Sequence, residues 1–126
     1  MIKMILLLSR KPGMSLEDFQ DYYENRHVPL ASSFEGPLIR YRRNYIVDRS
    51  VGLADCDCIT EVWYDLDGNW RDHRDNIVSP EMAEIIAKDE AQFLDRAATR
   101  IVIVEERESA PDTLPGNRER TVAPDR

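Results

Sequence analysis

In this 126-residue chain, the order of segments with strand-like and helix-like hydrophobic patterns restricts the fold more than any other feature of the sequence. A strand composition, rich in β-branched, aromatic and aliphatic side chains, occurs in four segments: 1–9, 38–47, 58–64 and 99–105. Apolar residues at helical spacing occupy residues 15–30, between the first two strands, and residues 79–95, between the last two. We therefore predict an α+β domain of ferredoxin-like β-α-β-β-α-β order, the split βαβ arrangement.

Capping residues set the expected helix boundaries. Ser15 followed by Asp18 is typical of a capping box at the start of the first helix. One face of this helix carries the residues Leu16, Phe19, Tyr23, His27 and Leu30. Pro29 is expected to end or kink the helix, because it lacks a backbone N–H and its ring clashes one turn back. Ser79, followed by a proline, begins the last helix, and Asp67 is expected to cap a short helix before it.

Two helices can cover only one face of the predicted four-stranded antiparallel sheet. The other face carries β-branched and aromatic side chains, which a monomer would leave exposed. We expect two copies to pack these faces together as a homodimer, a dimeric α/β barrel. Residues 1–106 form the predicted domain. Residues 107–126 contain three prolines and charges of both signs, and we expect a polar arm that is mobile or clasps the partner subunit.

Charge and composition restrict the partners. The chain has 24 acidic and 17 basic residues, a formal net charge of -7, which disfavours binding to nucleic acid or to an anionic membrane. The apolar segment 2–8 is far shorter than the roughly 20 residues that span a bilayer, so we expect a cytoplasmic protein. Cys56 and Cys58 have no further cysteine pair with which to complete a zinc site, and no phosphate-binding glycine loop is present.

His27 is the strongest candidate for a catalytic residue. It lies on the apolar stripe of the first helix, one turn after Tyr23, where an imidazole can exchange a proton near neutral pH. A structural role is the alternative, because a histidine near a helix C-terminus can satisfy the end carbonyls and the helix dipole. His73 lies among charged residues, and we expect it at the surface.

Asp89 is the first candidate partner of His27. The expected buried face of the last helix carries Met82, Ile85, Ile86 and Phe93, and Asp89 is close to that face. If the carboxylate approaches His27, the two can act as a base and its orienting acid. The alternative is an ordinary ion pair of Asp89 with a surface cation. Tyr23 is a second group that can orient the imidazole or protonate a leaving oxygen.

Aromatic residues of the strands are candidates for binding a flat apolar ligand, although such residues are more often plain core. The candidate substrate-binding residues are Tyr41, Tyr45, Glu61, Trp63 and Phe93. Glu61 shares a strand face with Trp63, so it is either a carboxylate of the pocket or a residue of the dimer interface that pairs with an arginine of the second strand.

Several motifs together resemble one known family. They are Arg10-Lys11-Pro12-Gly13-Met14-Ser15, Phe19-x-x-Tyr22-Tyr23-x-x-Arg26-His27-x-Pro29-Leu30, Ile59-Thr60-Glu61-Val62-Trp63-Tyr64 and Asp89-Glu90-x-x-Phe93-Leu94-Asp95. This pattern is similar to that of the EthD family, within the dimeric α/β-barrel superfamily. The His-x-Pro-Leu end of the helix motif is the most specific part. The resemblance extends to about Glu106 and does not cover the C-terminal arm.

The resemblance implies a homodimer with facing sheets and a cleft, between helices and sheet, that the helix-one histidine reaches. Relatives include proteins linked to alkyl-ether breakdown, muconolactone-type isomerases, polyketide cyclases and fungal dehydratases. Their common theme is proton transfer on a hydrophobic cyclic substrate without a metal. By position, His27 corresponds to the general acid/base, while Asp89, Glu90 and Asp95 are recurring acidic positions without an assigned role.

Three functions follow as hypotheses. The first is a cofactor-free enzyme in which His27 removes an acidic proton next to a carbonyl, with Asp89 or Tyr23 assisting, to isomerise, cyclise or dehydrate a small hydrophobic substrate. The second is a binding protein that shields a reactive hydrophobic intermediate, with His27 only as a hydrogen-bond donor. The third is a haem-using monooxygenase, which the same barrel can host.

Overall fold

This computed structural model describes residues 1–52 and 55–118. Its elements in chain order are β1 (Ile2–Leu8), α1 (Leu16–Tyr22), η1 (Tyr23–His27), α2 (Val28–Ser33), β2 (Leu38–Tyr45), β3 (Cys58–Tyr64), α3 (Trp70–His73), α4 (Pro80–Glu90), η2 (Arg96–Ala98), β4 (Arg100–Val104), η3 (Pro111–Thr113) and η4 (Pro115–Asn117). The turn η1 is π-helical, and η2, η3 and η4 are 3₁₀ turns. Each strand lies within its predicted segment. None of the helices in the described ranges has the length and apolar character needed to cross a membrane.

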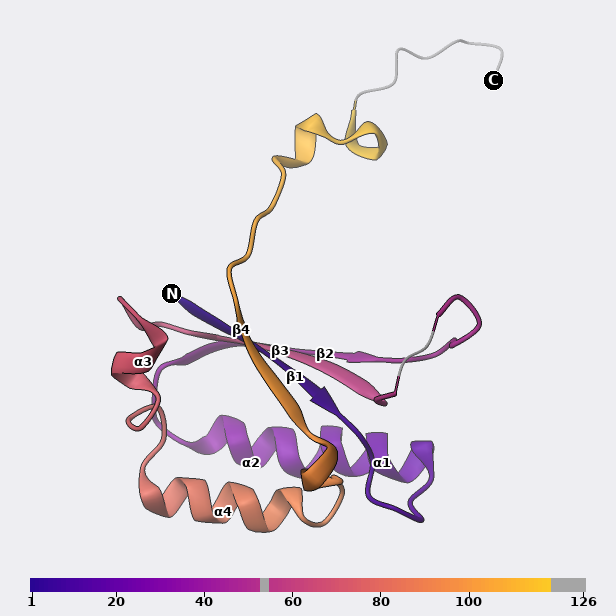
Figure 1. Cartoon of the computed structure of the whole chain (residues 1–126), viewed down its shortest axis with the longest axis vertical. Coiled ribbons are helices and arrows are strands. Elements are labelled where there is room, and N and C mark those ends of the chain that lie inside the picture. The colour runs from indigo at the N-terminus through magenta and orange to yellow at the C-terminus, as the bar shows by residue number, and fades with distance from the viewer. Residues whose placement is uncertain (53–54, 119–126) are drawn as a thin grey trace.

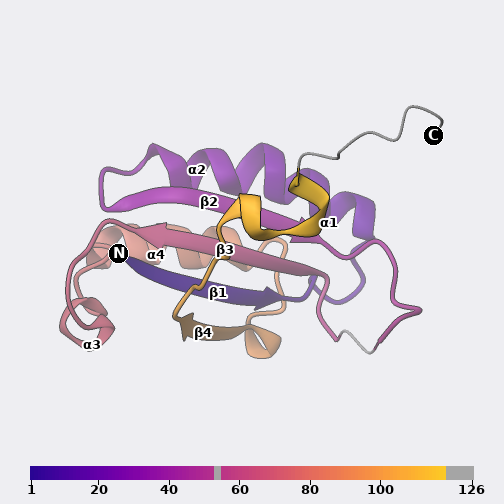
Figure 2. The same cartoon turned by 90° about the horizontal axis from the view of Figure 1, so that it is seen from above.

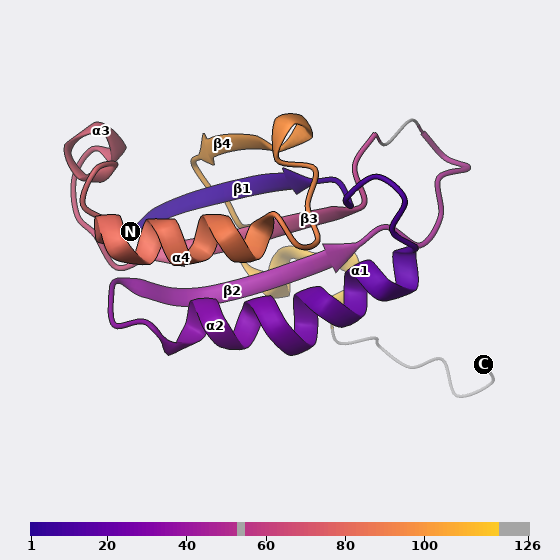
Figure 3. The ribbon, with the colours of Figure 1, turned by 90° about the horizontal axis from the view of Figure 1, so that it is seen from below.

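The four strands form one antiparallel sheet in the order β2-β3-β1-β4. The elements α1, η1, α2 and α4 lie against one face of this sheet (Figure 1, Figure 3). From the opposite side the strands are open to view, except where the C-terminal segment passes over them (Figure 2). The structure confirms the predicted ferredoxin-like α+β fold with its helices on one face.

The first helix continues past Pro29, where the sequence predicted an end or a kink. The π-helical turn η1 changes the hydrogen-bond pattern just before the proline, so that the Val28 N–H donates to the Tyr23 carbonyl oxygen, five residues back. Pro29 then lies in the first turn of α2, where a missing N–H is tolerated. His27 is therefore inside a continuous helical segment and not at its C-terminus, which removes the explanation that it satisfies terminal carbonyls.

The helix before β4 is shorter than predicted, and α3 has a different cap. The helix α4 ends at Glu90, because the chain then folds into turns in which the N–H groups of Phe93 and Leu94 both donate to the Glu90 carbonyl oxygen. These turns place both side chains in the core, at 0% and 4% exposure. Asn69, and not Asp67 as predicted, caps α3 by accepting a backbone N–H of its first turn.

The core lies between the sheet and the helices. Its buried cluster consists of Leu8, Phe19, Tyr23, Cys58, Phe93 and Leu94. The Phe93 ring packs against the rings of Phe19 and Tyr23, with centroids 5.9 and 5.2 Å apart, and so joins the first helix to the turn after α4. Ile85, predicted to be buried, is 44% exposed and takes no part in this cluster.

Trp63 lies on the open face of the sheet, where charged side chains cover it. Lys3 and Arg40 are 4.4 and 4.6 Å from the centre of its ring. The indole has an exposed fraction of only 3%, because the alkyl stems and charged ends of these residues shield it. Lys3 also bonds Glu61 at 2.8 Å, so Glu61 pairs with a lysine of β1 and not with an arginine of β2, as predicted for an interface position.

The C-terminal arm, residues 107–118 in the described part of the chain, leaves the domain after β4. Figure 1 shows it extending away from the helices, on the open side of the sheet. Hydrogen bonds within the arm shape η3 and η4, for example that from the Asn117 side chain to the Pro111 carbonyl oxygen at 2.9 Å. Leu114 is 43% exposed there. The arm thus has a local fold of its own.

Candidate functional site

A carboxylate of α4 orients His27. The His27 Nδ1 atom is 2.8 Å from Oδ2 of Asp89, and the two side chains have exposed fractions of only 8% and 16%. The other Asp89 oxygen accepts the Tyr22 hydroxyl at 2.7 Å. Because an ionised carboxylate only accepts, it favours the tautomer in which Nδ1 carries the hydrogen and Nε2 has a free lone pair. No residue in the described ranges hydrogen-bonds Nε2.

Two aromatic rings hold the imidazole in place. The centroids of Phe93 and Tyr23 are 4.9 and 5.7 Å from that of His27. Tyr22 stacks on Phe93 at 5.2 Å, so the residue that holds Asp89 is itself packed. Burial and the bond to Asp89 raise the pKa of Tyr22, which keeps its hydroxyl a donor. The imidazole therefore has little freedom to rotate away from Asp89.

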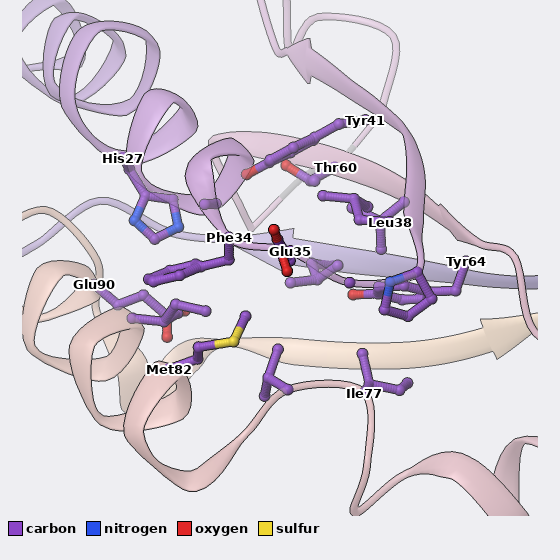
Figure 4. Close-up of a pocket in the computed structure, with 17 residues that line it drawn as sticks. His27, Phe34, Glu35, Leu38, Tyr41, Thr60, Tyr64, Ile77, Met82 and Glu90 are labelled. Atoms are coloured by element: carbon purple, nitrogen blue, oxygen red, sulfur yellow. The ribbon is translucent and has the colours of Figure 1, made fainter.

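The remaining edge of His27 borders a cavity of about 140 Å³ between the helices and the sheet (Figure 4). Most of its wall is apolar and includes Leu6, Phe34, Leu38, Val62, Met82 and Ile86. An apolar cavity of about 150 Å³ in another protein binds one benzene molecule. The cavity is thus the right size for a single ring, next to a histidine nitrogen that no described residue hydrogen-bonds.

Hydroxyl groups contribute to the polar part of the cavity wall. Tyr41 and Thr60 both line it, and the buried Tyr23 hydroxyl is hydrogen-bonded to both, at 2.9 and 2.8 Å. Burial raises the pKa of Tyr41, so its hydroxyl stays protonated at neutral pH. In Figure 4 the Tyr41 ring extends from its strand toward His27. A hydrogen-bond donor and a proton acceptor therefore border the same space.

Glu90 brings a carboxylate to the same cavity. It follows Asp89 in α4, and Figure 4 shows it on the side of the cavity where His27 lies. Burial raises the pKa of Glu90, and the nearby His27 opposes this rise. No side chain in the described part of the chain donates a hydrogen bond to this carboxyl. Glu90 thus keeps its hydrogen-bonding capacity for a ligand.

The structure brings six of the eight predicted site residues together. The three catalytic candidates His27, Asp89 and Tyr23 form one cluster, and the rings of Tyr41, Tyr45 and Phe93 contact it. Of the six, only His27 and Tyr41 border the cavity, whereas the other four lie behind them. Sequence reasoning therefore found the cluster but did not separate ligand-contacting residues from supporting ones.

The other two predicted residues lie elsewhere, and the hydroxyl of Tyr45 has partners outside the cavity. The Tyr45 hydroxyl donates to Glu24, whose carboxylate also forms a two-bond ion pair with Arg43. Glu61 and Trp63 are on the open face of the sheet, opposite the helices that carry His27. The alternation of side chains in β3 places Thr60 and Val62 toward the helices instead.

Sequence reasoning missed Tyr22, Thr60 and the cavity position of Glu90. Tyr22 precedes His27 by five residues, a spacing that does not share one face of an α-helix. The π-helical turn between them lets both contact Asp89. No rule of composition predicts such a turn, although π-turns often occur at functional sites. For Thr60, the alternation along β3 was the available signal.

A model of the EthD domain matches residues 11–97. This chain belongs to the EthD domain family. The matched range contains His27, Asp89 and Glu90 and ends before β4, so the C-terminal arm is outside it. No curated protein matches this EthD-family chain.

Solved structures share its fold. An EthD-family protein of Bacillus halodurans, which covers 85% of this chain and is itself covered completely (100%), has 21% identity and a TM-score of 0.62. The Arabidopsis thaliana protein At3g17210 has 18% identity and a TM-score of 0.56 in a crystal structure, with 87% of this chain and 99% of that chain covered. Its solution structure has 19% identity and a TM-score of 0.54, with 86% and 90% covered. At these identities the likeness concerns the fold.

Proposed function

We propose that this EthD-family protein is an enzyme that moves a proton on a small hydrophobic ring compound, with His27 as the general acid/base. The proposal depends on the different environments of the two ring nitrogens of His27. Nδ1 is bound to Asp89, and the ring borders the cavity with Nε2 unpartnered by any described residue. A base that is fixed at one nitrogen and available at the other is positioned for proton transfer.

In the proposed reaction, Nε2 takes a proton from a carbon next to a carbonyl, and the electron pair of that C–H bond forms an enolate. The Asp89 carboxylate, at 2.8 Å, stabilises the imidazolium that results. The Tyr41 hydroxyl is placed to donate a hydrogen bond to the enolate oxygen. Return of the proton to another carbon gives isomerisation. Attack of the enolate carbon on a second carbonyl of the same molecule gives cyclisation, in which the C=O π bond breaks and the resulting alkoxide takes the proton back from the imidazolium. Protonation of a leaving hydroxyl, which departs as water, gives dehydration.

Each of these steps moves a proton and an electron pair within the substrate, so none of them consumes an oxidant or a reductant. We therefore infer a cofactor-free enzyme of isomerase or lyase type. Apolar walls support the proposal, because they exclude water from the enolate and strengthen its interactions with His27 and Tyr41.

A direct test uses a simple single-ring substrate, the unconjugated isomer of cyclohexenone, whose conversion to the conjugated enone requires proton abstraction next to a carbonyl. We expect His27→Gln to lower the rate by roughly 10²- to 10⁴-fold, the usual contribution of a general base. His73→Gln is the matched control, because His73 is the only other histidine and bonds the Asp67 carbonyl oxygen, outside the cavity. Equal rates for the two variants would refute the proposal, and binding without conversion would favour the shielding protein.

The proposal includes a homodimer joined through the open sheet faces. Ile5, Ile59 and Val102 are apolar residues on this face, and Val102 is 47% exposed. Charges of both signs, such as Lys3 and Glu61, lie beside them, so the face can complement a second copy of itself across a two-fold axis. The C-terminal arm projects from the same side, in reach of such a partner (Figure 1).

Light scattering tests this dimer. Ile59→Glu buries a charge in the proposed interface, and we expect the variant to be a monomer at concentrations where the wild type is a dimer. Ile85→Glu is the matched control, because Ile85 is exposed on α4, on the helical side of the sheet. A monomeric wild type, or an Ile59→Glu dimer of unchanged stability, would refute the interface.

A further inference from the structure

The charged groups around the cavity are unusually one-sided. Its lining contains two carboxylate side chains, Glu35 and Glu90, but none of the seventeen lining residues, all in the described ranges, is a lysine or an arginine. The imidazole of His27 is the single group there that can become a cation, and its Nδ1 already faces the Asp89 carboxylate. Arg96 is close enough to Glu90 to act on its pKa, but it is exposed and outside the lining.

An anionic ligand would meet two penalties in this cavity. It would lose its hydration against apolar walls with no cation to compensate, and it would lie beside the Glu90 carboxyl. A neutral ligand meets neither penalty, and its carbonyl can accept a hydrogen bond from Tyr41.

We propose that Glu90 makes this pocket selective for uncharged single-ring ligands and against ring carboxylates of the same shape. The inference rests on the proposed function for the location of the site, and it names the substrate class that function acts on. The volume of the cavity and the charge of its lining support this selectivity independently. A volume of about 140 Å³ admits one ring, and the lining residues supply no lysine or arginine to pair with an acid group. Specificity of this kind comes from a group that repels the wrong ligand, not from a better contact with the right one.

The test measures binding and not turnover. Benzamide and benzoate have nearly the same shape and differ by one negative charge at neutral pH. Each is titrated into the protein while the ring signals of His27 and His73 are followed by NMR. His27 borders the cavity and His73 does not, so shifts at His27 alone place the ligand in this pocket. We expect benzamide to bind at least about tenfold more tightly than benzoate, because like charges in one site repel.

Two variants assign the preference to one side chain. Glu90→Gln keeps the shape of Glu90 and removes its charge, so the ratio of the two dissociation constants should fall toward one, mostly through tighter benzoate binding. Glu84→Gln is the matched control, because Glu84 lies on the same helix but pairs with Lys88 in solvent, and it should leave the ratio unchanged.

Each outcome decides the inference. Benzoate that binds as tightly as benzamide to the wild type would overturn it, as would an unchanged ratio in Glu90→Gln or the absence of saturable binding for either compound. A benzamide preference that depends on Glu90, in a protein whose His27→Gln variant keeps the full isomerisation rate, would support the selectivity and refute the proton-transfer chemistry. The two proposals can therefore fail separately.

Discussion

Replacing Asp89 by asparagine asks whether the carboxylate charge, and not only its shape, makes His27 a base. In the wild type, Oδ2 of Asp89 is 2.8 Å from Nδ1 of His27, and Oδ1 accepts the Tyr22 hydroxyl. Asparagine fits the same space, so packing around the site is kept. It lacks the charge that stabilises the imidazolium, and its amide can donate to Nδ1, which then moves the ring hydrogen to Nε2. Nε2 would no longer accept a proton.

The size of the effect follows from these two changes. Hydrogen bonds to charged groups contribute about 1.5–3 kcal/mol and neutral ones about 0.5–1.5, so loss of the charge alone weakens imidazolium stabilisation by about 1–2 kcal/mol. That difference corresponds to about a 5- to 30-fold lower rate. A histidine held in the wrong tautomer lowers kcat by about 10⁴-fold in a serine protease. We therefore expect Asp89→Asn to lose between about fivefold and about 10⁴-fold in the isomerisation rate.

Two measurements separate the causes. The ring ¹⁵N shifts of His27 report which nitrogen carries the hydrogen, and the isomerisation assay reports the rate. Asp95→Asn is the control, because Asp95 lies shortly after α4 and its side chain forms no hydrogen bond with His27 or Asp89. An Asp89→Asn rate equal to that of the wild type, with the protein folded, would show that Asp89 does not assist His27.

Two further predictions concern stability. Burial raises the pKa of Glu90 in the folded protein, so ionisation of this carboxyl destabilises the fold as the pH rises. Below pH 4.5, the ordinary pKa of a glutamate, this penalty is absent. Glu90→Gln should therefore raise Tm at neutral pH and leave it unchanged in acid, and an equal change of Tm at both pH values would contradict this. Phe93 has 0% exposure and contacts His27, Tyr23 and Phe19, so Phe93→Ala should cost about 3–5 kcal/mol in urea unfolding. Phe93→Leu should cost distinctly less, and similar losses for both variants would argue against a packed ring.

The fold was accessible from the sequence because its periodic segments alternate clearly. The strand β1 pairs Leu8 with Cys58 of β3, and these residues have 2% and 0% exposure, as expected for one buried face of a period-two pattern. The end of the first helix was harder to predict, because a proline such as Pro29 normally indicates a helix boundary. A π-turn depends on hydrogen bonds that the backbone makes in the folded state, and no single residue type specifies it.

The site was accessible only in part, because the sequence predicts faces but not which face of the sheet a cavity adjoins. Trp63 has an aromatic side chain of the kind that often binds ligands. The alternation of side chains in β3 nevertheless places it on the open face, where Lys3 and Arg40 cover it. Thr60, three residues earlier in β3 and not among the predicted site residues, faces the cavity. The direction of alternation could be decided only once the helices were placed on the sheet.

Asp89 and Glu90 show how two adjacent carboxyl groups acquire different roles. Successive residues of an α-helix point about 100° apart, so only one of the pair can face His27 Nδ1 while the other faces the cavity. Asp89 forms hydrogen bonds with an imidazole and a tyrosine hydroxyl, which suits it to hold a base. Glu90 meets apolar walls and no donor in the described ranges, so its charge acts on the ligand instead. The environment and not the residue type separates the two roles. Loss of Asp89 should therefore reduce the rate for every substrate, and loss of Glu90 should change which ligands bind.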